Sequence, residues 1–264
     1  MPSENIDAIK LDEQNFYKKH TADFFKIHDV KDLSWEQFFS SYLHKPYRLY
    51  IDYVKKIAHP EARMLDLCCG TGEFSFELAE LPSKSLLCID FSQESIACAK
   101  EKLSHTDLKH IQFEVGDVER LYLEPQSVDM ICMAGSLSYL NLDILLKNVC
   151  HWLKPEGSFI VVDTYGHNPI FNFKRFLNYI FKFTTKQTRL GIPTQATVEK
   201  IRSYFHEFDI QYSGIFAFIG PFLRPLIGET LAAKAVDTLD TLFPFLKHWA
   251  FKITFCAKKP KRPL

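Results

Sequence analysis

Short apolar runs recur along the chain from residue 63 onward, and segments of helical period separate them. Runs bounded by turn residues are typical of buried strands. We predict strands at about 64–67, 85–90, 111–115, 128–133, 158–163, 208–218 and 250–257. Helices are expected between them, one capped by Ser92 that ends near Leu103 and one capped by Asn141 that ends at Leu153. This alternation predicts an α/β fold.

The chain before residue 61 is predicted to be helical and to lie outside the main core. A capping box at residues 34–37 starts one helix. Residues 42–58 continue with an apolar stripe on one side of a helix, and Pro60 ends it. Lys154-Pro155-Glu156-Gly157 is expected to form a turn before the fifth strand.

The first strand runs into a glycine-containing turn, Cys68-Cys69-Gly70-Thr71-Gly72, and a helix follows. Glycines there let a ligand approach the backbone closely, and the free N–H groups at the helix start favour a polar ligand. The dinucleotide pattern G-x-G-x-x-G is incomplete, because Cys68 and Ser75 occupy its first and third glycine positions. Asp66 precedes the turn, and a buried carboxylate there needs partners. A cationic or hydroxyl-rich ligand would supply them, whereas a pyrophosphate would be repelled.

The stretch Asp66-x-Cys68-Cys69-Gly70-Thr71-Gly72 resembles motif I of the class I S-adenosylmethionine (SAM) methyltransferases. Its Cys-Cys form is similar to that of some ubiquinone and menaquinone C-methyltransferases. The resemblance covers residues 45–165. It implies a Rossmann-like, seven-stranded, mostly parallel sheet in the order 3-2-1-4-5-7-6, with SAM as cofactor and S-adenosylhomocysteine as product. It also places Asp66, Cys68, Gly70 and Gly72 in the cofactor site.

Further cofactor contacts are expected at the ends of strands two and three. Asp90 follows Gly72 by 18 residues, close to the spacing of about 20 at which an acid binds the ribose in such folds. Phe91 could pack on the adenine. By resemblance, Asp117 would accept a hydrogen bond from the adenine amino group and the Val118 N–H would donate to the ring. Alternatively, Asp117 only caps a turn.

The end of strand four should pass beneath the methyl-donor half of the cofactor, which brings in Ala134, Ser136 and Tyr139. Open α/β sheets bind ligands at the carboxyl ends of their strands, so candidate catalytic bases are His167, Tyr139 and Asp163. The D/N-P-P-Y motif of amino-group methyltransferases is missing, and so is the carboxylate cluster of the metal-dependent catechol type. We therefore expect no metal and no amide or adenine methylation.

Composition limits the partners. The chain has 264 residues with net charge zero, so no global charge favours nucleic acid. Apolar content of 47% fits a globular protein with a sizeable core. The seven cysteines form no C-x-x-C pair and are expected to be reduced thiols in a cytoplasmic protein. The chain contains no uncharged run of about 18 apolar residues, so we expect no membrane-spanning helix. The N-terminus is polar, so we expect no signal peptide there.

Two segments are unusual for this fold. Residues 164–198 contain no acid, and Phe173, Phe176, Leu177, Ile180 and Phe181 form an apolar helical stripe among basic residues. Residues 220–249 form a long insertion before the last strand. We expect a helical lid over 1–60 and a SAM-binding domain over 61–264, with insertions 167–192 and 220–249 as a substrate cap. A basic amphipathic helix also fits peripheral membrane contact; ordinary packing on the domain is the equal alternative.

Within the lid, Tyr17, His20, His44 and Tyr47 are candidates to lie over the ligands, because N-terminal helices do so in the resembling enzymes. The favoured function is methyl transfer from SAM to oxygen or carbon of a small, hydrophobic or lipid-linked acceptor. A nicotinamide-dependent oxidoreductase and a non-catalytic SAM-binding or interaction protein are the alternatives. A homodimer is left open.

Overall fold

The computed structural model describes residues 35–181 and 191–261, and all its strands belong to one sheet. The strands are β1 (Arg63–Leu67), β2 (Ser85–Asp90), β3 (Ile111–Val115), β4 (Val128–Ala134), β5 (Leu153–Thr164), β6 (Phe205–Ser213) and β7 (Lys252–Pro260). Their order is β3-β2-β1-β4-β5-β7-β6, and β7 alone runs antiparallel to its neighbours β5 and β6. The strand order and the mostly parallel sheet that the resemblance implies are both confirmed.

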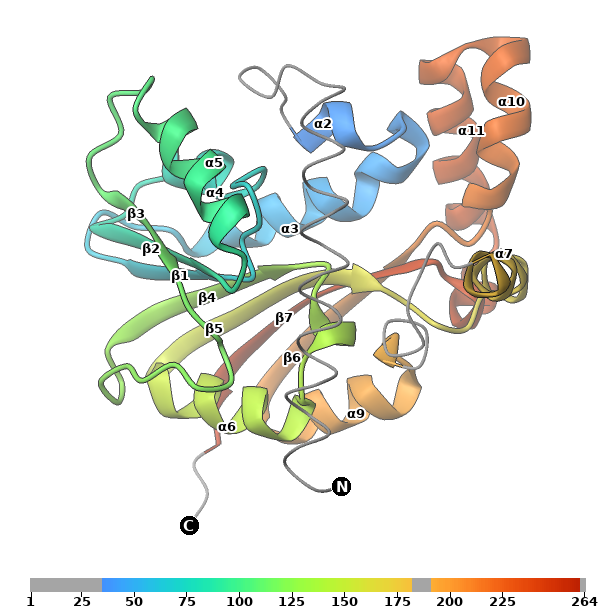
Figure 1. Ribbon diagram of the computed structural model, residues 1–264. Coiled ribbons are helices and arrows are strands. Elements are labelled where there is room, and N and C mark those ends of the chain that lie inside the picture. The colour runs from blue at the N-terminus through green and yellow to red at the C-terminus, as the bar shows by residue number, and fades with distance from the viewer. Residues whose placement is uncertain (1–34, 182–190, 262–264) are drawn as a thin grey trace.

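Helices cover both faces of this sheet (Figure 1). They are α2 (Trp35–Phe38), α3 (His44–Ile57), α4 (Ser75–Ala79), α5 (Gln93–Leu103), α6 (Leu142–Trp152), α7 (Pro169–Ile180), α9 (Gln195–Ser203), α10 (Gly220–Ile227) and α11 (Glu229–Leu242). Short 3-10 helices are η2 (Ser41–Leu43), η3 (Leu137–Tyr139), η4 (Ala217–Ile219) and η5 (Pro244–Trp249). Ser92 and Asn141 cap α5 and α6 as predicted. No helix within the described ranges has the length and apolar character needed to span a bilayer.

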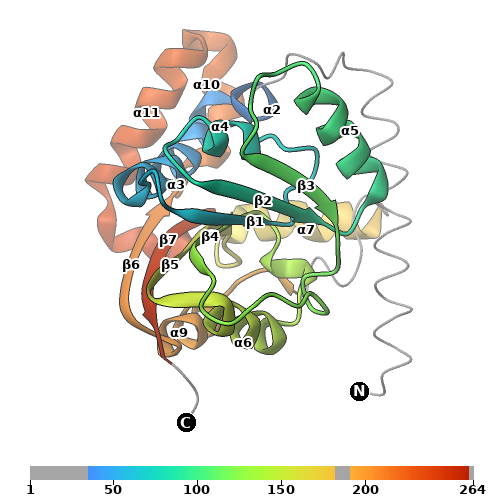
Figure 2. The ribbon, with the colours of Figure 1, turned by 90° about the vertical axis from the view of Figure 1, so that its left-hand side faces the viewer.

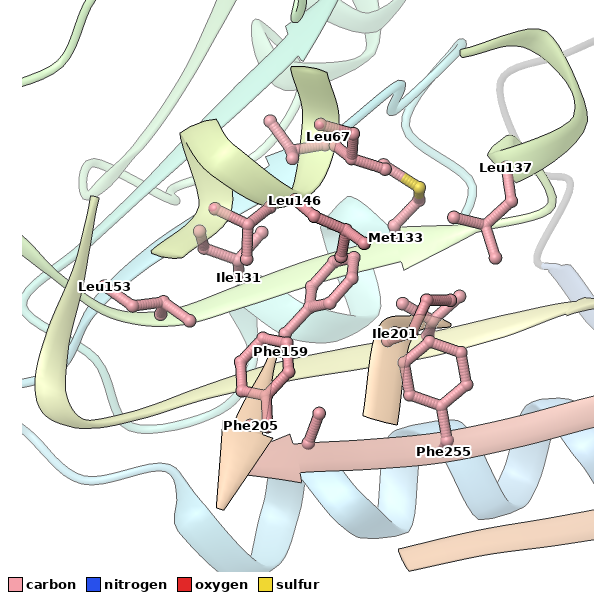
Figure 3. Close-up of a cluster of buried hydrophobic side chains, with 14 of the residues drawn as sticks. Leu67, Ile131, Met133, Leu137, Leu146, Leu153, Phe159, Ile201, Phe205 and Phe255 are labelled. Atoms are coloured by element: carbon pink, nitrogen blue, oxygen red, sulfur yellow. The ribbon is translucent and has the colours of Figure 1, made fainter. Parts of the chain in front are cut away.

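The core is split by the sheet into two layers, because successive side chains of a strand point to opposite faces. On β5, Phe159 and Val161 pack on the α6 and α9 side, whereas Ile160 and Val162 face α3. Figure 3 shows the first layer, in which Phe159, Phe205 and Phe255 lie beneath Leu146 of α6. Each such side chain contributes about 1.5–3 kcal/mol by burial, so this core fixes the strand ends that carry the site.

Several element boundaries differ from the sequence prediction, most clearly in β5, β6 and β7. The segment expected to turn at 154–157 belongs to β5, which begins at Leu153, and the β4–β5 pairing shifts register there. Residues 154–157 are thus the extra length of a bulge. Strand β6 ends at Ser213, five residues early, because Gly214 follows with a φ of +74°. Strand β7 begins at Lys252.

The insertion between β6 and β7 packs on the N-terminal part of the chain. Helices α10 and α11 stand as a pair beside the N-terminal helices (Figures 1 and 2). The Ser41 N–H donates to Glu229 Oε1 at 2.8 Å, and the Ser41 hydroxyl donates to the Glu229 carbonyl oxygen at 3.0 Å. A Cβ on Gly220 would lie 2.5 Å from the Tyr42 ring, so only glycine allows this approach. Whether these segments cap a substrate stays a prediction, and Tyr17 and His20 lie outside the described residues.

Candidate functional site

The turn after β1 has positive φ values at its two glycines and also at one residue that is not glycine. Gly70 and Gly72 have φ values of +57° and +84°. A Cβ on Gly72 would lie 2.9 Å from the Phe76 ring. Cys68, at the first glycine position of the dinucleotide pattern, also has a positive φ of +56°. For a residue with a Cβ this left-handed conformation costs about 1–2 kcal/mol, so the turn keeps its shape despite the replaced glycine.

Asp66 lies on β1 directly below the turn, with only 2% of its surface exposed. The hydroxyl of Ser75 donates to Asp66 Oδ2 at 2.6 Å. Burial raises the pKa of Asp66 to about 7. Ser75, which occupies the third glycine position of the dinucleotide pattern, is therefore the internal partner of this carboxylate. Sequence reasoning noted the missing glycine there and did not see the partner.

Asp90, at the end of β2, holds the glycine turn in place. Its Oδ2 accepts from the Gly70 N–H at 2.9 Å, and its Oδ1 accepts from the Ser92 N–H at 2.9 Å. The Gly116 N–H after β3 donates to the Asp90 carbonyl oxygen at 2.9 Å, which aligns the next strand end. Burial raises the pKa of Asp90. A carboxylate offers about four lone-pair sites, so Asp90 keeps acceptor capacity for a ligand.

Glu73 is a further acid of the turn that sequence reasoning missed. The Thr71 hydroxyl donates to its carboxylate, and Lys102 Nζ of α5 donates to the Thr71 carbonyl oxygen at 3.1 Å. Burial raises the pKa of Glu73, and Lys102 opposes that effect. The only signal in the sequence is an acid placed directly after the last glycine. Together with Asp66 and Asp90 it gives the turn three carboxyl groups.

Asp117 and Val118 follow β3 at the rim of the site. Asp117 Oδ1 accepts from the Glu119 N–H at 3.0 Å, and Oδ2 lies 3.7 Å from Arg120 Nε. This is the turn cap that the sequence left as the alternative role of Asp117. Val118 is buried, and Asn148 Nδ2 donates to its carbonyl oxygen at 3.1 Å. Phe91, half-buried, directly follows Asp90, so the predicted adenosine residues occupy neighbouring strand ends.

The segment after β4 returns toward the turn. The Gly135 N–H donates to the Val162 carbonyl oxygen at 2.8 Å, which keeps this segment against β5. Ser136 is buried and lies near the Cys68 thiol, whose pKa is raised by burial. Tyr139 closes η3, and its N–H donates to the Ser136 carbonyl oxygen at 3.1 Å. The segment of Ala134 and Ser136 therefore lies beside the glycine turn, and its contact with a cofactor stays a prediction.

The catalytic candidates have structural partners. Both carboxylate oxygens of Asp163 accept backbone N–H groups, from Leu137 at 2.8 Å and from Thr164 at 2.5 Å. Burial raises the pKa of Asp163. His167 is exposed, and its Nε2 accepts from the Gln195 N–H at 3.0 Å at the start of α9. Asp163 and His167 thus hold loops in place at the carboxyl ends of the strands.

Aromatic rings of the N-terminal helices lie against the helix that follows the turn. The ring centroid of Phe74 is 5.8 Å from that of Trp35 and 5.3 Å from that of Tyr47. His44 Nε2 donates to the Phe39 carbonyl oxygen at 2.6 Å. Two of the lid candidates, His44 and Tyr47, are therefore buried parts of this aromatic cluster.

Within the described part of the chain, no group of three or more histidine, cysteine or acidic residues could hold a metal ion. All seven cysteines are free thiols, and five of them are buried.

A parallel sheet with a glycine turn after β1 and an acid after β2 defines an α/β fold that binds nucleotide-type ligands at the carboxyl ends of its strands. The family described as "Methyltransferase domain" matches residues 58–205. The chain therefore belongs to the class I SAM-dependent methyltransferase family, and the oxidoreductase alternative is wrong.

Two curated relatives show how far this likeness extends. A demethylmenaquinone methyltransferase of Lactococcus lactis is 34% identical over 125 residues, 45% of this chain and 48% of that protein. A malonyl-[acyl-carrier protein] O-methyltransferase of Bacillus cereus is 31% identical over 136 residues, 46% of this chain and 49% of that protein. The chain thus spans about half the length of these relatives.

Among solved structures, phosphoethanolamine N-methyltransferase 2 of Haemonchus contortus with bound SAM has a TM-score of 0.59 at 18% identity. The match covers 81% of this chain and 53% of that one. At this identity the likeness shows the shared fold.

Proposed function

We propose that this protein transfers a methyl group from SAM to oxygen or carbon of a small acceptor that is hydrophobic or lipid-linked. Family membership supports the reaction class. The relatives' names give two kinds of acceptor, demethylmenaquinone and malonyl-[acyl-carrier protein]. The apolar helices after β5 and β6 support the hydrophobic character of the acceptor.

The observation that carries this proposal is the acidic surrounding of the glycine turn. Burial raises the pKa of Asp66, Glu73 and Asp90, and the charge of Asp90 adds to this effect on the other two. Lys102 is the cation beside them and lowers the pKa of Glu73. SAM carries a positively charged sulfur and an ammonium group, which such a site attracts. A pyrophosphate would meet the same acids with the opposite result. The site therefore fits SAM and opposes a dinucleotide.

Each predicted cofactor residue has a proposed role. The remaining lone pairs of Asp90 would accept the ribose hydroxyls, with Phe91 packed on the adenine. Asp117 and the Val118 N–H would bind the edge of the ring. Asp66 lies below the turn and would face the positively charged half.

The residues at Cys68, Gly70 and Gly72 would let the ligand lie close to the backbone, with Ala134, Ser136 and Tyr139 on its other side. When bound, SAM supplies a methyl group that is already activated by the positive charge on sulfur.

The chain's own residues then have to align the acceptor and exclude water. The aromatic cluster of Trp35, Tyr47 and Phe74 would exclude water from the N-terminal side. Of the catalytic candidates, Tyr139 closes the short helix that follows Ser136, the residue near the Cys68 thiol of the turn, so we favour it as the group that moves a proton. Asp163 and His167 would position loops. Tyr139→Phe should lower turnover without changing SAM affinity, whereas His167→Gln should mainly lower stability.

Calorimetry with SAM, S-adenosylhomocysteine and NAD tests the cofactor assignment. We expect binding of the first two and none of NAD. Asp129→Asn is the control for variants of the acids around the turn and should bind SAM like wild type, because the Asp129 carboxylate pairs with Lys154 at 2.8 Å at the opposite end of the sheet. NAD binding without any heat from SAM would contradict the proposal. If the protein binds SAM but transfers its methyl group to none of the acceptors tested, a non-catalytic SAM-binding protein would be favoured instead.

We further propose that α7 and the insertion dock on an anionic membrane surface. None of the residues of α7 is buried, and Phe173 and Ile180 are 64% and 52% exposed. In the insertion, Phe222 and Leu226 of α10 are 73% and 79% exposed. Soluble monomers rarely leave large apolar patches uncovered. In Figure 1, α7 lies on the side of the molecule where β5 ends, and Asn168 at its start donates to the Trp249 carbonyl oxygen at 2.6 Å, at the end of the insertion.

Lipid is the favoured occupant because the charge of α7 is complementary to an anionic surface. Helix α7 contains Lys174 and Arg175 and no acid. Docking there would bring a lipid-linked acceptor to the strand ends. The cytoplasmic location expected from the sequence would make the inner leaflet the relevant surface.

Co-sedimentation with phosphatidylglycerol vesicles, at low and high salt, tests the membrane proposal. The double variant Phe173→Ser/Ile180→Ser should lose retention. Tyr122→Ser is the control, because this side chain is 74% exposed and lies outside α7 and the insertion. Equal retention of all three proteins would contradict docking through α7. A concentration-dependent dimer that the double variant abolishes would assign the surface to a second copy instead.

A further inference from the structure

Three polar side chains form a row across the last three strands at the carboxyl edge of the sheet. Thr164 of β5 pairs with Lys252 of β7, and Lys252 pairs with Ser213 of β6. Directly paired residues point to the same face. The next residue on that face, Thr254, donates from its hydroxyl to the Pro46 carbonyl oxygen at 3.0 Å, so the row faces α3. Because β7 is antiparallel, its first residue lies at the ligand-binding edge.

Lys252 is the centre of this row, and its ammonium forms no direct ion pair with a described residue. Only 7% of the residue is exposed. Its Nζ donates to Thr164 Oγ1 at 3.3 Å and lies 5.1 Å from the centroid of the Tyr47 ring. No carboxylate of the described residues lies within 4 Å of it. A lysine is rarely buried unless it is paired, and ring faces replace only part of its hydration.

Ser213 provides an independent sign of an absent partner. It is 1% exposed, and its hydroxyl has no hydrogen-bond partner. A buried hydroxyl without a partner costs about 1–3 kcal/mol. This unpaired hydroxyl belongs to the residue of β6 that pairs with Lys252, on the same face of the sheet, so a ligand group that enters the row could reach both.

A second cation borders the row. Arg175 of α7 lies 5.4 Å from the centroid of the Phe251 ring, and Lys252 Nζ lies 5.7 Å from the same centroid. The acid that interacts with both cations is Asp163, whose carboxylate oxygens already accept two backbone N–H groups. The two cations therefore share one acid, which two backbone N–H groups already engage.

We propose that Thr164, Lys252 and Ser213 form an anion-binding subsite that receives a carboxylate or phosphate group of the methyl acceptor. Lys252 supplies the charge, and the two hydroxyls supply directed hydrogen bonds. Arg175 adds long-range attraction from α7. The assignment of the anion to the acceptor rests on the proposed methyltransferase function; the subsite itself rests on the geometry alone.

Inorganic phosphate is the probe. The melting temperature of the full chain is measured against phosphate concentration, with ionic strength held constant by sodium chloride. Wild-type protein should be stabilised in a saturable manner. Lys252→Met should lose the effect, corresponding to at least about tenfold weaker binding for a charged hydrogen bond. Lys258→Met, on the same strand and the same face at its far end, should keep it.

Ser213→Ala separates binding from folding. Because its hydroxyl has no partner to lose, the variant should be as stable as wild type or more stable, and yet bind phosphate several-fold more weakly. Lower stability with unchanged phosphate response would overturn the subsite, and so would a wild-type protein that phosphate does not stabilise.

Calorimetry with SAM on the same variants identifies the anion. Affinity for SAM should stay unchanged in Lys252→Met, because the subsite serves the acceptor. A parallel loss of SAM affinity would assign the row to the cofactor's own carboxylate and overturn the proposal. If wild type binds phosphate but no SAM, the proposed function fails while the subsite stands.

Discussion

Replacement of Asp66 by Asn should stabilise the unliganded protein at neutral pH and weaken SAM binding. The folded carboxyl has its pKa raised by burial from 3.8 to about 7. The folded state therefore keeps a proton that the unfolded state releases, and stability falls as the pH rises from about 4 to about 7. At about 1.36 kcal/mol per pKa unit, the full effect is at most about 4 kcal/mol. Asn carries no proton to release and still offers Oδ1 to the Ser75 hydroxyl.

Urea unfolding of both proteins at pH 4.5, 6 and 8 measures this effect as a difference, so that other titrating groups cancel. Near pH 4.5 the two free energies of unfolding should be close. By pH 8 the Asn variant should be more stable by about 2–4 kcal/mol. Calorimetry at pH 8 should show weaker SAM binding, because the variant lacks the buried negative charge. A stability difference that does not change with pH would refute the argument.

Three further predictions concern the glycine turn. Cys68→Gly should change the free energy of unfolding by less than about 1 kcal/mol, because glycine relieves the strain of the positive φ and so offsets the lost side chain. Cys69→Gly should lower the free energy of unfolding by more than this, and denaturant unfolding curves of both variants measure the difference. Gly72→Ala should cost at least about 2 kcal/mol in the same assay, since its Cβ meets two phenylalanine rings, whereas Gly228→Ala, at a similar φ with nothing within 4 Å, shows the backbone effect alone; equal losses would contradict the steric account. Asp90→Asn should weaken SAM binding by about 1.5–3 kcal/mol in calorimetry, and Asp90→Ala should also lower the melting temperature because two backbone N–H groups lose their acceptor; unchanged affinity in both would place the ribose elsewhere.

The sheet and the glycine turn were predictable because their signals are local. Strand spacing and the residues from Asp66 to Gly72 carry them, and the strand order came with the resemblance. The boundary of β5 was not predictable, because a Lys-Pro-Glu-Gly run is typical of a turn and only pairing with β4 makes it a bulge.

Side-chain partnerships between distant strands were also beyond the sequence. Ser75 reads as a missing glycine until the helix places it above Asp66. The row of Thr164, Lys252 and Ser213 depends on the register of three strands, and the long insertion hides how β6 and β7 align. The apolar stripe of α7 was visible in the sequence, but its exposure required the fold.

The position of β7 has a consequence for how the protein is made. This strand is the last of the sheet to be synthesised, and yet it lies inside the sheet, between β5 and β6. Until it leaves the ribosome, β5 and β6 both present unpaired edges, and such edges invite pairing with other chains. The nascent chain therefore has a late window in which chaperones matter most. Nonsense or frameshift changes that remove only residues after 250 should leave insoluble product instead of a weakened enzyme.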